Sequence, residues 1–327
     1  MGETVLLLAV IQMSEKGVKA RGTRLRDPYG RALNSFRISV TQRCNFDCFF
    51  CHREGELNPK SEISVNEIKK IATVASDLGM RKFKLTGGEP LLRPEIVDIV
   101  REIKPYAEEV SLTSNGYLMA KYAPKLKEAG LKRVNISLHS SDPKTFKKIT
   151  GSNGLSEVKK GIVAAVESDL NPVKINMVVL NGYNVDEIPD MIELTKNLGV
   201  ILQLIEFQPI QAGTQPYWNK FYCDMREIEE MLESRSEKIR ERPLQLRKQY
   251  YLKNGGVVEV VRPMHSTRFC MHCSRLRLTS DGRLKPCLMR NDNLVDIISL
   301  IRSGETREVL IGAFKEAVSR RAPYWRE

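Results

Sequence analysis

Apolar runs of five to seven residues recur along the chain, and each is bounded by turn-forming or charged residues. The runs are Phe36–Val40, Lys82–Thr86, Glu109–Thr113, Arg133–Leu138, Val173–Val179 and Ile201–Phe207. Segments with apolar residues at helical spacing lie between them. Strands that alternate with helices indicate βα units, whose strands form a parallel sheet. The pattern therefore predicts an α/β fold with six βα units.

Several of the intervening helices have clear boundaries in the sequence. Ser64 and Glu67 form a capping box, and Gly79 suits the residue after a helix. The predicted helices include Val65–Leu78, a short helix from Asp142-Pro143, Leu155–Val166 and Arg226–Glu237. Six βα units can form either an open doubly wound sheet or a partial barrel, and the pattern alone does not decide between them.

The pattern changes after Gln208, where a loop and a charged amphipathic helix replace the βα repeat, followed by a predicted strand pair. We therefore predict three parts: a flexible N-terminal tail at 1–24, a main domain at 25–240 and a C-terminal region at 241–327. The only apolar run of the tail, Val5–Ile11, is too short to span a membrane. We expect a cytoplasmic protein.

The net charge and the cysteines reduce the number of function classes that fit the chain. The 327 residues carry a net charge of +12, which suits nucleic acid, a membrane surface or a small polyanion. Nothing resembles a nucleic-acid module, and basic residues recur in the predicted strands, so we expect a polyphosphate and neither nucleic acid nor membrane. Seven cysteines, in two triplets plus Cys223, indicate metal binding in a reducing compartment rather than disulfides.

The first triplet follows the first predicted strand with Cys-x3-Cys-x2-Cys spacing, at Cys44, Cys48 and Cys51. Three thiolates can hold three corners of an iron–sulfur cube, which leaves the fourth iron without a protein ligand and open to chemistry. A structural zinc site would need a fourth ligand, and His52 is the nearest candidate.

The second triplet has Cys-x2-Cys-x13-Cys spacing, at Cys270, Cys273 and Cys287. Taken in isolation it favours zinc, with His272 or His265 as the fourth ligand. The Asp281-Gly282 turn predicts a hairpin that returns Cys287 to the other two cysteines. Arg275 and Arg277 project from one face of its first arm, where two planar cations suit a guanine base.

Three motifs together resemble a known family: residues 37–51, Thr86-Gly87-Gly88-Glu89-Pro90-Leu91, and the second triplet. From about Asp27 to about Ala313 the chain resembles the GTP 3′,8-cyclases of molybdenum cofactor biosynthesis, within the radical S-adenosylmethionine (SAM) superfamily. The resemblance implies a partial (βα)6 barrel with a [4Fe-4S] cluster at its mouth. It also implies a C-terminal extension with a second [4Fe-4S] cluster, whose open iron meets the purine.

The resemblance further implies roles for individual residues. Cluster ligands are the two cysteine triplets, and the catalytic set is Cys44, Cys48, Cys51, Arg275 and Arg277. The SAM-binding residues are Phe50, Gly87, Gly88, Glu89, Ser137 and Gln208, with Glu89 on the methionine amino group. The GTP-binding residues are Arg37, Lys84, Thr113, Lys174, Arg275, Leu276 and Arg277.

The alternation of residues along a strand supports part of the predicted GTP-binding set. Two alternatives remain: Gly87-Gly88 could form only a tight turn, and the lysines could lie on an exterior face of the sheet. Lys82 and Lys84 share one strand face, and a lysine inside a barrel requires an anion. The chain also departs from the family. Gln203 stands where a basic residue is common, and the C-terminus ends in 320–327, with Arg320 and Arg321, instead of a Gly-Gly tail. His139 stands where many members carry Asp, and we give it no role.

The implied activity is conversion of GTP to (8S)-3′,8-cyclo-7,8-dihydroguanosine 5′-triphosphate, after a 5′-deoxyadenosyl radical removes the 3′ hydrogen. A ferredoxin or flavodoxin would supply electrons, cyclic pyranopterin monophosphate synthase would use the product, and the family implies a homodimer. The alternatives are a radical SAM peptide-modifying enzyme with an auxiliary cluster and a non-enzymatic zinc-binding module.

Overall fold

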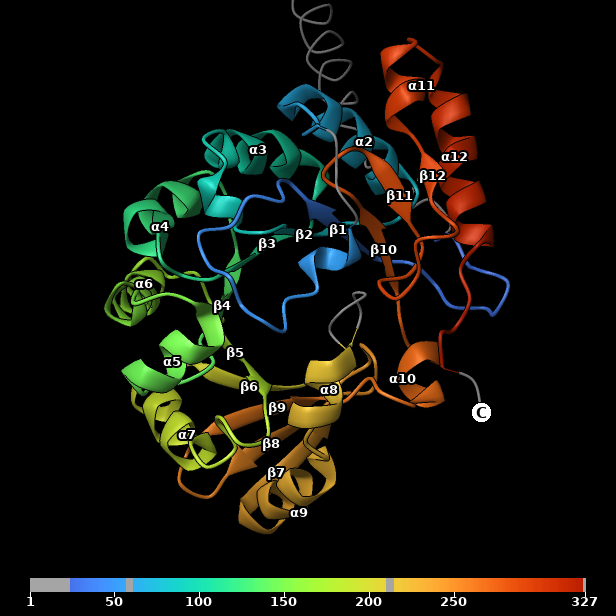
Figure 1. The fold of residues 1–327 in the computed structure, drawn as a ribbon. Coiled ribbons are helices and arrows are strands. Elements are labelled where there is room, and N and C mark those ends of the chain that lie inside the picture. Colours follow the sequence, from blue (N-terminus) through green and yellow to red (C-terminus); the bar gives the residue numbers. More distant parts are fainter. Residues whose placement is uncertain (1–23, 57–60, 210–214, 326–327) are drawn as a thin grey trace, which may run out of the picture.

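The structure is a computed structural model that describes residues 24–56, 61–209 and 215–325 (Figure 1). The predicted tail lies outside the described residues except for Arg24. One sheet has the order β12-β11-β10-β1-β2-β3-β4-β5-β6-β9-β8-β7. Its strands are β1 Ser35–Ser39, β2 Lys82–Thr86, β3 Glu109–Ser114, β4 Arg133–Ser137, β5 Lys174–Val179, β6 Ile201–Glu206, β7 Ser236–Glu241, β8 Lys248–Leu252, β9 Val257–Val261, β10 Arg275–Leu278, β11 Arg283–Lys285 and β12 Val295–Asp296.

Helices cover the outer face of this curved sheet (Figure 1). Those of the βα units are α2 Val65–Asp77, α3 Ile96–Ile103, α4 Met119–Glu128, α5 Pro143–Thr150, α6 Leu155–Glu167 and α7 Ile188–Asn197. The later helices are α8 Gln215–Phe221, α9 Met225–Arg235, α10 Thr267–Met271, α11 Ile298–Arg302 and α12 Arg307–Ser319. None of the described helices is long and apolar enough to cross a membrane.

The six predicted strands are β1 to β6, each within one residue of its predicted bounds, and they are parallel neighbours. The α/β fold class is confirmed, and the sheet is an unclosed barrel rather than a doubly wound sheet. The predicted capping box is also present, because Ser64 accepts from the Glu67 N–H and Glu67 accepts from the Ser64 N–H. The predicted helix Arg226–Glu237 ends earlier, at Arg235, because β7 begins at Ser236.

The C-terminal segments extend both edges of the barrel. β10 pairs in parallel with β1, and β9 pairs in parallel with β6, so eight adjacent strands run in one direction. The predicted hairpin is present, because β10 pairs antiparallel with β11 around Gly282. The boundary predicted near residue 240 falls at the end of β7, within this continuous sheet.

Apolar side chains from the strands fill the layer between sheet and helices. Phe36 and Ile38 of β1 and Phe83 of β2 have no exposed surface, and Phe36 also contacts Phe314 of α12 with ring centroids 5.7 Å apart. Because strand residues alternate in direction, the residues between these apolar ones point into the barrel. The inward-facing positions are strongly polar, and this puts the candidate site inside the barrel.

Candidate active site

The barrel encloses a cavity of about 810 Å³. All six cysteines of the two triplets line it, together with residues from β1 to β6 and from β10. The six cysteines are free thiols. The structure therefore brings the two predicted triplets, more than two hundred residues apart in sequence, to one chamber.

The first triplet lies on a loop that rests on the Gly87-Gly88 turn. The Gly88 N–H donates to the Thr41 carbonyl at 2.8 Å, and a Cβ on Gly88 would lie only 2.4 Å from the Arg43 carbonyl oxygen. Glycine is therefore required at 88 for the backbone to approach the cysteine loop this closely.

The chemistry of the first triplet suits a cationic group. Burial is the largest influence on each thiol, and it raises the pKa of Cys44, Cys48 and Cys51. Backbone N–H groups point at two of the sulfurs, from Phe46 to Cys44 Sγ and from Arg53 to Cys51 Sγ, both at 3.4 Å, and Asn115 Nδ2 donates to Cys44 Sγ at 4.0 Å. Buried thiols of this kind ionise when a metal supplies the positive charge, so the residues fit a metal cluster.

In the second triplet Cys270 lies on α10, Cys273 lies between α10 and β10, and Cys287 follows β11. Two arginines, Arg31 and Arg321, hold the backbone of this triplet. Arg31 Nη1 donates to the Cys270 carbonyl at 2.9 Å, and Arg321 Nη2 donates to the Cys273 carbonyl at 2.7 Å. Both arginines share the buried carboxylate of Asp27. Arg321 therefore supports the second triplet through its backbone, and it also lines the cavity. Of the terminal arginine pair, Arg320 instead bonds the Leu294 carbonyl at the surface.

Electrostatics at the second triplet differ from those at the first. Burial would raise the pKa of Cys273, but Arg321, Arg275 and Arg277 outweigh it and the pKa falls below its ordinary value. Residues 24–56, 61–209 and 215–325 contain no group of three or more His, Cys, Asp or Glu side chains arranged to hold a single metal ion. A cube takes each cysteine on a different iron, so its ligands stand farther apart than those of zinc. The three thiols of this triplet are a donor set that such a cube can take, one on each of three irons.

Basic side chains line the wall between the triplets. Arg37, Lys84, Lys174, Arg275 and Arg277 all face the cavity. Lys84 Nζ donates to Asn135 Oδ1 at 2.8 Å, and burial followed by the neighbouring cations lowers its pKa well below 10.5.

Some side-chain donors on the cavity wall are not used in hydrogen bonds. Thr113 Oγ1 is buried and has no hydrogen-bond partner among the described residues, and Arg37 Nε makes only a 3.5 Å ion pair with Glu54. Buried polar atoms are normally paired, so an unpaired hydroxyl on a basic wall suits a bound anion.

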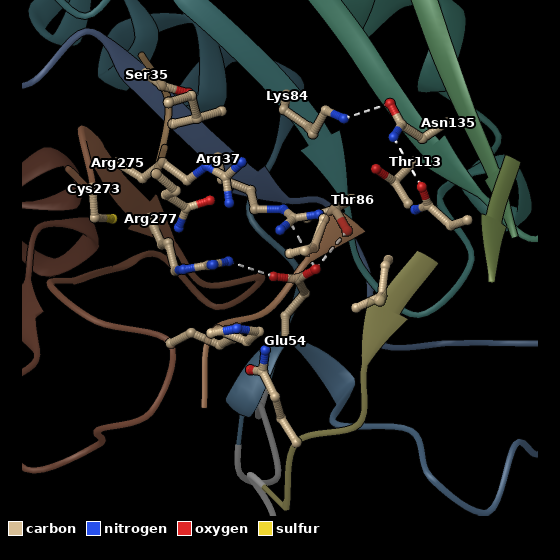
Figure 2. A pocket seen from close by; sticks show the side chains of 18 of the residues that line it. Ser35, Arg37, Glu54, Lys84, Thr86, Thr113, Asn135, Cys273, Arg275 and Arg277 are labelled. Atoms are coloured by element: carbon tan, nitrogen blue, oxygen red, sulfur yellow. Dashed lines mark hydrogen bonds and ion pairs between the residues drawn. The ribbon is translucent and has the colours of Figure 1, made fainter. Parts of the chain in front are cut away.

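Glu54, which the sequence analysis missed, connects the first cysteine loop to these cations (Figure 2). It accepts from Arg277 Nη1 at 2.7 Å and Thr86 Oγ1 at 2.8 Å, and it lies 3.5 Å from Arg37 Nε. Burial would raise its pKa, but Arg37 and Arg277 lower it to about 2. Its φ of +54° is rare for a residue other than glycine. Its position three residues after Cys51 was the only signal in the sequence.

Two family models and several known relatives match this chain. The family model "Radical SAM superfamily" matches residues 38–195, and "Molybdenum Cofactor Synthesis C" matches residues 200–327. The "Probable GTP 3′,8-cyclase" of Thermococcus kodakarensis is 46% identical over 307 residues, which cover 92% of this chain and 100% of that protein. The protein of the same name from Pyrococcus horikoshii is 48% identical over 305 residues, covering 92% and 98%. The chain belongs to the GTP 3′,8-cyclase family.

Solved structures agree with the fold of this GTP 3′,8-cyclase family member. Streptococcus suis SuiB bound to its precursor peptide SuiA has a TM-score of 0.63 at 15% identity, covering 88% of this chain and 68% of that one. The structure described as anSMEcpe with bound AdoMet has a TM-score of 0.59 at 16% identity, covering 80% and 76%. At these identities the likeness concerns the fold alone. Radical SAM proteins use SAM and an iron–sulfur cluster, so this cyclase-family chain uses both.

Most residues predicted to bind SAM line the cavity of this GTP 3′,8-cyclase homologue: Phe50, Gly87, Gly88, Ser137 and Gln208. Glu89 does not line it. Its carboxylate is fully buried and accepts from the N–H groups of Leu91 and Asn115, at 2.9 and 2.6 Å, and from Ser114 Oγ at 2.8 Å. Burial raises its pKa to about 7.

One further predicted residue lies outside the cavity, and one residue without a predicted role lies in it. Leu276, predicted to contact GTP, is fully buried on β10 and is not part of the cavity wall. His139, to which we gave no role, does line the cavity, and its ring lies edge-on to Phe50 with centroids 4.8 Å apart.

Proposed function

We propose that this chain converts GTP to (8S)-3′,8-cyclo-7,8-dihydroguanosine 5′-triphosphate in molybdenum cofactor biosynthesis. The observation that carries the proposal is a single cavity lined by both cysteine triplets and by basic side chains of β1, β2, β5 and β10, in a chain 46% identical over 307 residues to a probable GTP 3′,8-cyclase. A site built only to modify a peptide has no need for this many cations on its inner wall.

The two triplets would hold the two iron–sulfur clusters, Cys44, Cys48 and Cys51 the first, Cys270, Cys273 and Cys287 the second. Phe50, Gly87, Gly88, Ser137 and Gln208 would line the SAM pocket beside the first triplet. Bound together, the first cluster and SAM supply one-electron chemistry that removes a hydrogen atom from the substrate.

The chain itself orients the nucleotide. Arg37, Lys84 and Lys174 would contact the phosphates, and Arg275 and Arg277 would bind the guanine beside the second triplet. Lys84 makes no ion pair among the described residues, so an anionic ligand would relieve its unfavourable burial. Because Glu54 fixes Arg277 and Arg37 on one carboxylate, both guanidiniums are oriented before the substrate arrives.

Three partners complete the proposal. A ferredoxin or flavodoxin would supply the electrons, a cyclic pyranopterin monophosphate synthase would consume the product, and the chain would act as a homodimer.

The test uses anaerobically reconstituted protein with SAM, GTP and a chemical reductant. We expect the cyclised nucleotide by mass spectrometry, and we expect Cys48→Ser and Cys273→Ser to abolish it. Cys223→Ser is the matched control, because Cys223 is half-buried outside the cavity and should turn over normally. Near-normal product from either triplet variant would contradict the proposal.

A further inference from the structure

A buried carboxylate on β9 gathers donors from three other strands and from the β7–β8 connection. Glu259 has no exposed surface. Its oxygens accept from Gln203 Nε2 at 2.7 Å, Arg242 Nη1 at 2.7 Å, Gln249 Nε2 at 3.2 Å, Arg247 Nη1 at 3.3 Å and Lys174 Nζ. Neither the barrel fold nor a single ion pair requires so many donors on one carboxylate.

The charges of this cluster do not cancel. Three cations, Lys174, Arg242 and Arg247, meet one carboxylate, which leaves an excess of two positive charges. All three cations and Glu259 line the cavity, so this excess faces the space where a ligand binds. Such an excess matches a phosphate group, and guanidinium forks suit phosphate oxygens.

Arg247 has a hydrogen-bond donor that the cluster does not use. Its side chain is 9% exposed, and its buried Nε has no hydrogen-bond partner among the described residues. Arg247 and Arg275 line the same cavity. The cluster therefore continues the basic wall from the second triplet toward β5.

Two of the three cations come from the β7–β8 connection, whereas β6 contributes the neutral Gln203. It lies opposite Glu259 in the β6–β9 register, and it uses its amide to bond that carboxylate. A basic residue at 203 would put its charge on the same carboxylate. In this chain Arg242 and Arg247 pair with the Glu259 carboxylate.

We propose that Arg242 and Arg247, oriented by Glu259, form a phosphate-binding subsite for the triphosphate of the nucleotide, in place of a basic residue at position 203. This inference rests on the proposed function and deepens it. Arg242 and Arg247 contact the substrate, and Glu259 is a positioning residue. If the cluster only stabilised the fold, removing one of its cations would weaken the binding of every ligand of the cavity by the same factor.

The test measures binding of GTP and of guanosine by equilibrium dialysis to reconstituted protein, without SAM or reductant. We expect Arg242→Gln and Arg247→Gln each to raise the Kd for GTP roughly tenfold to a hundredfold, the range of a charge-assisted hydrogen bond, while guanosine binding stays unchanged. Arg240→Gln, on the exposed part of β7, is the matched control and should bind both as the wild type does. Iron content and circular dichroism check that each variant is folded.

A second variant tests the substitution itself. Gln203→Arg in the Arg242→Gln background returns a cation to Glu259 and should recover most of the lost GTP affinity. Equal losses for GTP and guanosine, unchanged GTP binding, or no recovery with Gln203→Arg would each overturn the inference. A wild-type protein that binds no GTP would instead refute the proposed function, so the two failures are distinguishable.

Discussion

Replacing Glu54 with glutamine removes the charge that joins the first cysteine loop to the cation wall, while keeping the size of the side chain. Glu54 is 7% exposed, so water does not compensate for the lost charge. Arg277 Nη1, at 2.7 Å, and Arg37 Nε, at 3.5 Å, would both lose their anionic partner. Two buried guanidiniums would then lie close together without a counter-charge.

The loss of folding stability in Glu54→Gln can be calculated in two ways. The pKa of Glu54 falls from 4.5 to about 2. A shift of this size corresponds to about 3 kcal/mol of stability at neutral pH. Removing one partner from a buried ion pair costs about 3–5 kcal/mol. With an unfolding entropy of roughly 2.1 cal/mol/K per residue and 327 residues, a loss of about 3 kcal/mol lowers the melting temperature by about 4 °C.

The assay is anaerobic thermal unfolding of the reconstituted protein at neutral pH, followed by circular dichroism. Glu62→Gln is the matched control, because Glu62 and Arg43 form an exposed pair with 32% and 55% exposed side chains. Such a pair contributes about 1 kcal/mol or less, so the control should melt within about 1.5 °C of the wild type. Equal melting temperatures for Glu54→Gln and Glu62→Gln would refute the reasoning.

Two other substitutions test the surroundings of the first triplet. Gly88→Ala would put a carbon 2.4 Å from the Arg43 carbonyl oxygen, so we expect less iron per chain after reconstitution, whereas Gly312→Ala, with open space around it, should keep its iron. His139 accepts from the Val178 N–H at 3.2 Å, and burial lowers its pKa from 6.5 to about 4. Its contribution to stability is therefore present above pH 6.5 and is lost as the pH falls toward 4, by about 2 kcal/mol at pH 5. His139→Gln should reduce the fall in melting temperature between about pH 7.5 and pH 5, and an unchanged fall would contradict a buried neutral imidazole.

The sequence was sufficient to predict the barrel strands because each contains buried apolar residues, which alternate in several strands with polar residues that face the cavity. β7 was missed for the opposite reason: Ser236–Glu241 is an exposed edge strand made mostly of charged residues, and its beginning reads as the end of the preceding helix. An edge strand needs no apolar pattern, since one side of its backbone faces solvent.

The cavity could be predicted only in part, because its polar contacts join distant segments. Glu54 and Arg277 are 223 positions apart, and Asp27 and Arg321 are 294 positions apart. No local pattern distinguishes these residues from ordinary surface charges. The cysteine triplets were found because metal ligands recur at fixed spacing, whereas buried ion pairs have no spacing rule.

The central claim is that a nucleotide reacts inside the chamber shared by the two triplets. The most direct measurement supplies GTP with deuterium at C3′, together with SAM and reductant, and follows both products by mass spectrometry. The account predicts a cyclised nucleotide that has lost the deuterium and 5′-deoxyadenosine that has gained it. Cleavage of SAM with unlabelled 5′-deoxyadenosine, while the labelled GTP remains intact, would contradict it.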